Sequence, residues 1–330
     1  MSSTDALLFV LQACRAWGDA VAQAAGLEMA GHEERRFEDG EGKTRPLVNV
    51  RGRDVYVLQA LHGDPGESVH DRLCRLLFFV GALRDASAAR ITVVVPYLAY
   101  ARKDRKSQPR DPVATRYVAQ LLESVGTDRV LTMDVHNLAA FQNAFRCRTE
   151  HLEAAGLLAA HMVPLVAARN AVVVSPDAGG IHRAEQFRRR LEHAIARPVE
   201  LAFAEKHRAL GAVGGRMLAG DVRHRVAIVV DDLVSTGGTL ARTARACRDH
   251  GATCVYAVAT HGIFSPGAPA ALADADLAGV VVTDTVGGER LPPGQARERV
   301  SVVPTAALFG EAIRRLHAGG SLVELLAHAT

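Results

Sequence analysis

Residues 226–239, VAIVVDDLVSTGGT, join a run of mostly β-branched side chains to two carboxylates and then to a turn of small residues. A short apolar run such as 226–230 is typical of a buried parallel strand. Asp231 and Asp232 follow it, so we expect both at the carboxyl end of the strand, where open α/β sheets bind ligands. This stretch therefore predicts an α/β fold with a ligand site at this strand end.

The turn after the two acids consists of five small residues: Ser235, Thr236, Gly237, Gly238 and Thr239. Small side chains let the backbone amides, together with the positive end of a helix beginning near Leu240, point at one anion. The turn has no lysine of the Walker type, and the preceding acids can accept hydrogen bonds from neighbouring sugar hydroxyls. We expect a phosphorylated sugar to bind here. The alternative is an ordinary strand-to-helix turn with two solvated aspartates.

The composition is that of a globular chain, because 330 residues, 48% hydrophobic and 23% charged, suit two domains of ordinary size. A net charge of +3 does not by itself indicate a nucleic-acid partner. The five cysteines lie far apart and form no C-x-x-C pair, which is typical of free thiols in a reducing compartment. No apolar run reaches the length of a membrane span, and the first residues lack a basic signal region. We expect a cytoplasmic protein that binds neither nucleic acid nor membrane.

Strand and helix patterns alternate along the whole chain, which is typical of parallel sheets covered by helices. In the first half, strands are predicted at 54–59, 91–97 and 130–136, with helices over 67–85 and after Pro112. In the second half, a helix near Gly156 precedes strands at 171–177, 199–204, 226–232 and 254–261, with helices to about 193 and 250. Runs at 280–284 and 300–304 would add edge strands, and a helix over 305–317 would close the chain. We expect two stacked α/β domains, residues 1–153 with 305–330 and residues 154–304.

A basic segment follows the predicted strand at 91–97. Residues 100–112, YARKDRKSQPRDP, suit a polyphosphate, although a solvated loop or a subunit contact would have the same composition. The order Pro-Tyr-x-x-Tyr-Ala-Arg-x-Asp-Arg-Lys, which begins at Pro96, resembles the ATP-side signature of ribose-phosphate diphosphokinases. The order DDLVSTGGT resembles the phosphoribosyl-diphosphate motif that these enzymes share with type I phosphoribosyltransferases, which lack the ATP-side signature.

His136 and Asp177 are each expected to end a strand, one in either half of the chain. A neutral imidazole and a carboxylate can hold Mg²⁺ together with substrate phosphates. Taken alone, His136 better suits a packed or hydrogen-bonded surface histidine than a metal ligand. The sequences Asp134-Val135-His136 and SPDAGG at 175–180 resemble metal or substrate positions of the diphosphokinases, so the resemblance implies a metal role for both residues.

Lys206 and Arg208 follow a predicted strand and precede a glycine-rich stretch, ALGAVGG at 209–215. A basic loop of this kind can close over a reaction, and the alternative is an ordinary charged strand end. In the diphosphokinases a Lys-x-Arg pair on a flexible loop supplies charge to the transferred group. The resemblance therefore implies catalytic roles for Lys206 and Arg208.

The chain as a whole, from about Phe37 to about Leu325, resembles the ribose-phosphate diphosphokinase family, also called phosphoribosyl-diphosphate synthetases. The resemblance implies two phosphoribosyltransferase-type, Rossmann-like domains, each with a mostly parallel sheet flanked by helices. It also implies transfer of a diphosphoryl group from Mg-ATP to ribose 5-phosphate, in dimers that assemble into hexamers. The implied ATP-binding residues are Phe37, Asp39, Glu41, Arg102, Lys103 and Asp104. The implied ribose 5-phosphate residues are the two acids at 231–232 and the turn at 235–239. A type I phosphoribosyltransferase and a non-catalytic regulatory homologue are the alternatives.

Three positions depart from the family pattern. Ser235 stands where many members have Asp, and Lys103 stands where Gln is common. After His136 the chain reads NLAAFQNAF over 137–145, which differs from the usual Gln-rich continuation and is one residue longer. That region helps to form the regulatory phosphate site in many members, so the resemblance does not extend to control by phosphate and ADP.

Overall fold

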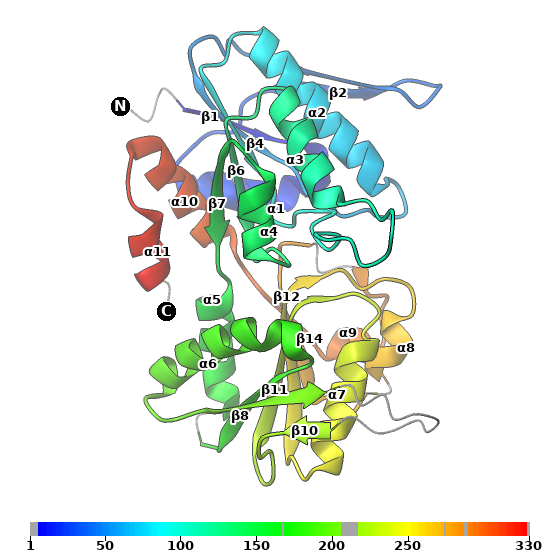
Figure 1. Cartoon of the computed structure of the whole chain (residues 1–330). Helices are drawn as coiled ribbons and strands as arrows, with labels where there is room; N and C mark the ends of the chain where they lie inside the picture. Colours follow the sequence, from blue (N-terminus) through cyan, green and yellow to red (C-terminus); the bar gives the residue numbers. More distant parts are fainter. Residues whose placement is uncertain (1–5, 167, 206–216, 274, 287–289, 329–330) are drawn as a thin grey trace. The chain divides into compact units, whose positions relative to one another are not determined.

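The computed structural model describes residues 6–166, 168–205, 217–273, 275–286 and 290–328 (Figure 1). The chain divides into two compact units: unit 1 runs to Glu153 and resumes over Ala306–His328, and unit 2 covers Ala154–Thr305. Each unit contains a parallel sheet flanked by helices, so the predicted α/β class is confirmed. Within the described ranges, no helix combines the length and the apolar character that crossing a membrane requires.

The sheet of unit 1 has the strand order β1-β4-β5-β6-β7, with parallel neighbours throughout the order. The bounds of these strands are Ala6–Val10 for β1, Asp54–Leu58 for β4, Arg90–Val94 for β5, Arg129–Met133 for β6 and Arg148–Leu152 for β7. A polar antiparallel hairpin, β2 at His32–Arg36 and β3 at Gly42–Pro46, is inserted between β1 and β4. The helices are α1 at Arg15–Ala25, α2 at Val69–Asp85, α3 at Ala114–Ser124, α4 at Leu138–Ala144, α10 at Ala306–Ala318 and α11 at Leu322–His328.

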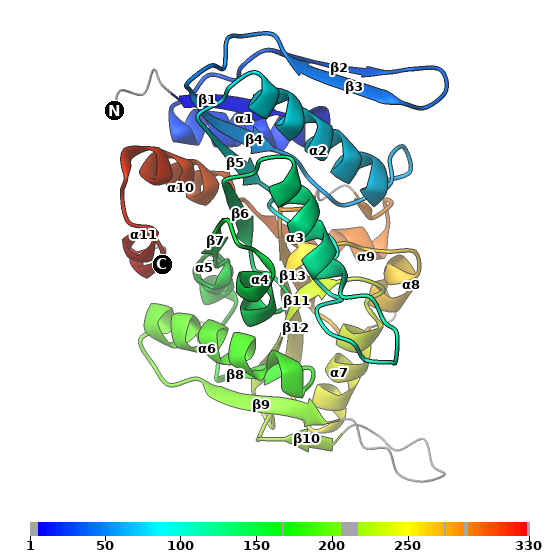
Figure 2. The same cartoon turned by 45° about the horizontal axis from the view of Figure 1, so that its top comes forward.

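Alternating side chains of the unit 1 strands bury both faces of the sheet. Phe9 and Val57 belong to the core that contains the apolar sides of α2 and α3. Val10 points to the other face, where α1 approaches so closely that a Cβ on Gly18 would lie 2.1 Å from a Val10 methyl carbon. Helix α10 lies beside α1 (Figure 2), and the rings of Trp17 and Phe309 make an edge-to-face contact between them. The helix after the second half of the chain therefore completes the core of the first.

Unit 2 has the strand order β10-β9-β8-β11-β12-β13-β14, with parallel neighbours except for β10 and β9. The strands are β8 at Ala171–Ser175, β9 at Glu200–Glu205, β10 at Met217–Ala219, β11 at Val226–Val234, β12 at Cys254–Gly262, β13 at Gly279–Thr283 and β14 at Val300–Val303. The helices are α5 at Ala155–Val166, α6 at Ile181–Ile195, α7 at Gly238–Asp249, α8 at Ala268–Ala273 and α9 at Gln295–Glu298. Strand β11 lies between β8 and β12, so its apolar residues are covered on both sides.

Several predicted boundaries are wrong. Strand β6 ends at Met133 and β8 ends at Ser175, so His136 and Asp177 lie in the connections after the strands. The chain leaves β6 because Asp134 adopts φ 40°, and it leaves β8 because the Asp177 side chain accepts a hydrogen bond from the Gly180 amide. Strand β11 continues to Val234, past the acid pair. Strand β13 lies inside its sheet and not at an edge, and α11 follows the helix that was expected to close the chain.

A buried carboxylate ties α10 to the sheet of unit 1. Asp54, at the start of β4, accepts hydrogen bonds from Arg90 Nε at 2.8 Å, from His317 Nδ1 at 2.8 Å and from the Tyr56 hydroxyl at 3.2 Å. Burial raises the pKa of Asp54, but the bonds from Arg90 and His317 outweigh burial and hold it below its usual value. The ionised form of Asp54 is thus the form that the fold stabilises.

We predict that Asp54→Ala lowers the free energy of unfolding of unit 1 by about 3 kcal/mol, because it leaves the half-buried Arg90 and the largely buried His317 without their shared acceptor. Urea unfolding followed by circular dichroism measures this change. Asp19→Ala is the matched control, since Asp19 pairs with Arg15 on the exposed face of α1 and should cost less than about 1 kcal/mol. Equal losses for the two variants would contradict the role given to Asp54.

Candidate functional site

The acid pair of β11 lies next to β12 and is largely removed from solvent. The side chain of Asp231 is 22% exposed and that of Asp232 is 5% exposed. The Asp232 amide donates to Asp231 Oδ1 at 2.9 Å. Burial and, next, the charge of Asp232 raise the pKa of Asp231 to about 7. Two adjacent carboxylates held in this way favour ligands that donate hydrogen bonds or carry positive charge.

Arg183 faces both acids from the first turns of α6. Its Nη1 atom lies 3.7 Å from Asp231 Oδ1 and 3.8 Å from Asp232 Oδ1. The positive charge of Arg183 lowers the pKa of Asp231 and so opposes the effect of burial. The sequence analysis did not identify Arg183, because its position opposite the acids depends on how α6 lies on the sheet. The six-residue spacing from Asp177 on the same segment was the available signal.

Helix α7 follows the turn and begins at Gly238, earlier than the predicted start near Leu240. Gly237 adopts φ 75°, and a Cβ there would also press on the Leu272 side chain at 3.3 Å. Glycine is therefore required at the N-cap, and a residue without a side chain leaves the first amides of α7 open to a ligand. A Cβ on Gly238 would lie 3.1 Å from Arg242 Nη1, so the Arg242 guanidinium lies beside the turn. Helical spacing of four residues could have indicated Arg242 from the sequence.

Ser235 is held by the loop that follows β12. Its hydroxyl lies 3.1 Å from the hydroxyl of Ser265, and the Ser265 amide donates to the Ser235 carbonyl at 3.0 Å. The structure therefore places two hydroxyls side by side at the first position of the turn. The predicted turn residues lie together with the acid pair in unit 2, and Ser265 is an addition that the sequence analysis did not make.

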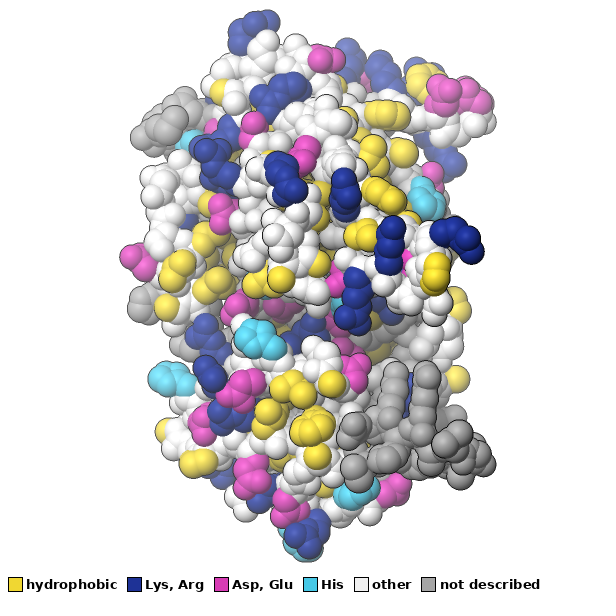
Figure 3. Space-filling view, in the orientation of Figure 1, with side chains coloured by type: hydrophobic (Ala, Val, Ile, Leu, Met, Phe, Trp, Pro, Cys, Tyr) yellow, Lys and Arg dark blue, Asp and Glu magenta, His cyan; other side chains and the backbone are white. Residues whose placement is uncertain are grey.

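The basic segment of unit 1 forms an irregular loop between β5 and α3. Arg102 is exposed there, along with Arg105, Lys106 and Arg110, and Lys and Arg side chains gather over this part of the surface (Figure 3). Lys103 forms an ion pair with Asp111 within the loop and donates to the Ser107 hydroxyl at 2.7 Å. Its contact lowers the pKa of Asp111. Lys103 thus supports the loop, whereas the exposed guanidinium of Arg102 is accessible to an anion.

His136 is exposed in the short connection between β6 and α4. The residue before it, Val135, donates its amide to His151 Nε2 at 3.2 Å, and the residue after it, Asn137, donates its side-chain amide to Asp104 Oδ2 at 2.7 Å. The structure therefore brings the connection that carries His136 together with the basic loop that carries Asp104. Asp177 belongs to unit 2, where its carboxylate caps the turn at Ala178–Gly180.

Phe37, Asp39 and Glu41 form the tip of the β2–β3 hairpin. The Phe37 amide donates to the Glu41 carbonyl at 2.8 Å, and the Glu41 amide donates to Asp39 Oδ1 at 3.0 Å. The guanidinium carbon of Arg35 lies 4.8 Å from the centre of the Phe37 ring. The predicted residues of this segment are therefore clustered in one compact turn of unit 1.

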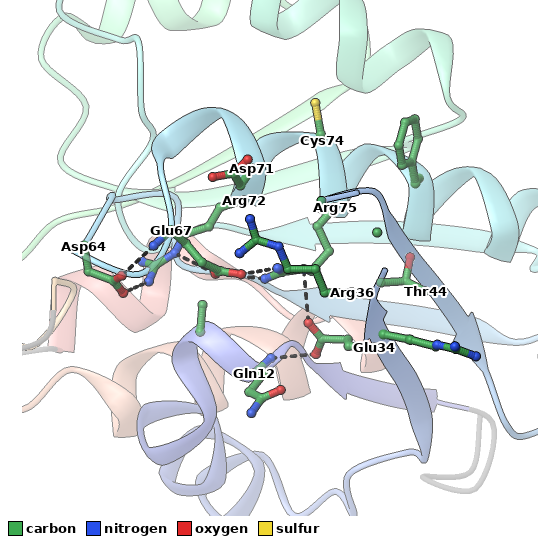
Figure 4. Close-up of a pocket in the computed structure, with 15 residues that line it drawn as sticks. Gln12, Glu34, Arg36, Thr44, Asp64, Glu67, Asp71, Arg72, Cys74 and Arg75 are labelled. Carbon is green, nitrogen blue, oxygen red and sulfur yellow. Dashed lines mark hydrogen bonds and ion pairs between the residues drawn. The ribbon is translucent and has the colours of Figure 1, made fainter. Parts of the chain in front are cut away.

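A cavity of about 430 Å³ lies between this hairpin and the start of α2 (Figure 4). Linked ion pairs line it: Arg72 with Asp64, Arg75 with Glu67, and Arg75 with Glu34 at 3.4 Å. These pairs connect the hairpin to α2. None of the predicted site residues lines the cavity, and Lys206 and Arg208 fall outside the described residues.

We predict that Asp231→Asn stabilises the folded chain at pH 8 by about 2 kcal/mol in the absence of metal and substrate. The pKa of Asp231 is about 7 when folded and 3.8 in the reference state, so ionisation increasingly favours unfolding as the pH rises from about 4 to 7. The gain should vanish below about pH 3, where Asp231 is protonated in both states. Urea unfolding in EDTA at both pH values measures it, with the exposed Asp276→Asn as the control. Destabilisation by Asp231→Asn at pH 8 would contradict the burial argument.

This chain matches known proteins in sequence and in structure along nearly its whole length. A family model described as the N-terminal domain of ribose phosphate pyrophosphokinase matches residues 6–126, and one described as the phosphoribosyl synthetase-associated domain matches residues 213–327. The ribose-phosphate pyrophosphokinase of Caldanaerobacter subterraneus is 39% identical over 306 residues, 92% of both chains, and that of Fusobacterium nucleatum is 36% identical over 307 residues, 92% of this chain and 93% of the relative. The crystal structure of phosphoribosylpyrophosphate synthetase from Mycobacterium smegmatis matches with a TM-score of 0.85 and 33% identity, covering 96% of this chain and all of that one. The chain therefore belongs to the ribose-phosphate pyrophosphokinase family, also called the ribose-phosphate diphosphokinases.

Proposed function

We propose that this protein transfers the diphosphoryl group of Mg-ATP to the 1-hydroxyl of ribose 5-phosphate, giving 5-phosphoribosyl 1-diphosphate and AMP for nucleotide biosynthesis. The observation that carries this proposal is the buried acid pair of β11 beside a glycine turn at the start of α7. The acid pair suits the ribose hydroxyls, and the glycine turn suits the 5-phosphate. Membership of the ribose-phosphate pyrophosphokinase family favours a chain that makes phosphoribosyl diphosphate over one that consumes it.

Ribose 5-phosphate binds in unit 2. Asp231 and Asp232 accept hydrogen bonds from the ribose hydroxyls, and their carboxylates gain from donors because burial disfavours their charge. The turn at 235–239 binds the 5-phosphate through the backbone amides that begin α7. Arg242 and Ser265 add a positive charge and a hydroxyl beside the same turn. The substrate is thus held at both ends, which fixes the position of its 1-hydroxyl.

ATP binds through the residues of unit 1 that the resemblance implies. Arg102 contacts its phosphates, while Asp104 and the Phe37 hairpin tip contribute to nucleotide binding. In the family pattern this tip reaches the site of a neighbouring subunit, so we propose self-association into dimers and hexamers. Large exposed apolar side chains, including Phe78 at 63% and Tyr117 at 51%, supply surface for such contacts. We also place the enzyme in the cytoplasm.

The donors available to a metal fit Mg²⁺, which prefers oxygen ligands and keeps bound water. Among the described residues, no group of three or more His, Cys, Asp or Glu side chains forms a complete metal cage. We propose that substrate phosphates complete the coordination of the magnesium ion, which Asp177 and His136 hold directly or through bound water. The bound ion would neutralise phosphate charge and orient the transferred group. Asp177 already orients one carboxylate oxygen through its bond from the Gly180 amide at 3.1 Å.

The chemical step is an in-line attack of the 1-hydroxyl oxygen on the β-phosphorus of ATP. The bond from that oxygen to phosphorus forms as the bond from the β-phosphorus to the α–β bridging oxygen breaks, and AMP leaves. Such transfers require positioning and charge stabilisation more than covalent participation of the protein. We assign the stabilising charge at the β-phosphorus to Lys206 and Arg208.

We predict that the purified chain forms AMP and phosphoribosyl diphosphate in equal amounts from ribose 5-phosphate, ATP and Mg²⁺. Lys206→Ala should lower kcat by about 100-fold to 1000-fold, because one charged donor to the transferred group is lost. Arg189→Ala, which alters an exposed arginine on α6, is the control and should retain the parent rate. Formation of ADP, or no turnover, would contradict the reaction, and a full rate for Lys206→Ala would contradict only the role of Lys206.

We predict that Ser235→Ala raises the KM for ribose 5-phosphate about tenfold, because a hydroxyl that can donate to the 5-phosphate is removed. The KM for ATP should remain within about twofold. Steady-state kinetics measure both constants, and Ser301→Ala on the exposed face of β14 serves as the control. An unchanged KM for ribose 5-phosphate would show that Ser235 does not contact the substrate.

A further inference from the structure

Asn137 uses both ends of its side-chain amide. Its Oδ1 accepts a hydrogen bond from the Ala140 amide at 3.1 Å, which caps the start of α4. Its Nδ2 donates to Asp104 Oδ2 at 2.7 Å, across 33 residues of sequence. This pattern needs one acceptor and one donor on the same side chain. Asn supplies both. Ser and Thr can cap the helix but are too short to reach Asp104, and Asp can cap the helix but has no donor when it is ionised.

The segment before Asn137 is also fixed. Asp134 adopts φ 40°, which is uncommon for a residue with a side chain, and its amide donates to the Leu152 carbonyl at 3.0 Å. The Val135 amide donates to His151 Nε2 at 3.2 Å. His136 therefore lies in a short connection anchored to β7 on one side and to Asn137 on the other. Its backbone position depends on both anchors.

The loop that carries Asp104 is held to α2 and α3 close to that residue. The Thr115 hydroxyl donates to the Tyr100 carbonyl at 3.0 Å, and Tyr100, at φ 65°, has its hydroxyl 2.6 Å from His70 Nδ1. These contacts fix the loop at its start. The Asn137 bond is a direct link from this loop to the connection that carries His136. It joins two segments that come from different strand ends of the same sheet.

We propose that Asn137 is a positioning residue for the ATP side of the reaction, which sets His136 relative to the loop of Arg102 and Asp104. This inference rests on the proposed function, because it assigns ATP contacts to those segments. Loss of the link leaves each segment folded but lets their separation vary.

The test uses Asn137→Ser, which retains a good helix cap but is too short to reach Asp104. We expect the KM for ATP to rise about threefold to tenfold, the cost of one hydrogen bond, with the KM for ribose 5-phosphate unchanged. Asn143→Ser is the matched control, since the Asn143 side chain lies on the same helix α4 and donates locally, to the Ala139 carbonyl at 2.8 Å. The melting temperature of both variants should remain that of the parent chain.

A polarity exchange tests the link itself. Asn137→Asp keeps the cap but sets two carboxylates against each other, so it should raise the KM for ATP more than Asn137→Ser does. In the double variant Asn137→Asp with Asp104→Asn, the donor and acceptor change places and the hydrogen bond can form again. We expect the double variant to bind ATP better than the product of the two single effects predicts.

Three kinetic outcomes would overturn the inference. These are a parent-like KM for ATP in Asn137→Ser, an equal effect of Asn143→Ser, and strictly independent effects in the exchange. A KM change that follows a loss of melting temperature would assign Asn137 a role in folding alone, and it would overturn the inference too. Failure of the parent chain to form AMP would instead contradict the proposed function, so the two failures are distinguishable.

Discussion

Two carboxylates lie side by side near the end of β11, where burial and mutual repulsion disfavour their charge. Sheet position makes this arrangement unavoidable, because β11 lies between β8 and β12 and is covered by helices on both faces. The surrounding structure compensates with Arg183 from α6, and in the proposed function the ribose hydroxyls would supply the hydrogen bonds that water no longer provides. The same strand leads directly into the glycine turn, so the sugar and phosphate contacts share one rigid support. The buried acid pair of β11 is therefore the source both of the proposed binding specificity and of a local loss of folding stability.

Unit 1 shows a different design, in which loops after the strands carry the ligand residues and short hydrogen bonds fix the loops. The basic loop is supported from within by Lys103 and Asp111, and the connection around His136 is supported by His151 and Asn137. The hairpin that carries Phe37 is supported at its base by the ion pairs of Arg75 with Glu67 and Glu34. Apart from Lys103, the supporting residues lie outside the predicted contact residues. Altering a support should therefore change substrate affinity without removing a substrate contact.

The sequence was sufficient to predict the structural features that depend on a local pattern of residues. The β-branched run of β11, the acid pair and the glycine turn could be predicted because their order in the chain is also their order in space. The polar hairpin β2–β3 and the strand β7 were missed, since HEERR and RTEHL show no apolar alternation, and β1 was missed although its run ALLFV is apolar. Arg183, Ser265 and the Asn137–Asp104 bond were missed because each depends on packing between distant segments. His136 was placed at a strand end, but the left-handed backbone of Asp134 ends β6 earlier.

The central claim is that the buried acid pair of β11 receives the ribose hydroxyls. Isothermal titration of ribose 5-phosphate at pH 7, in buffers of different ionisation enthalpy, measures it most directly. With a pKa of about 7, Asp231 is partly protonated before binding and becomes ionised as it accepts the hydroxyls. We predict that binding releases a fraction of a proton in the parent chain and that Asp231→Asn abolishes this contribution. Equal proton release and equal affinity in the two proteins would contradict the account.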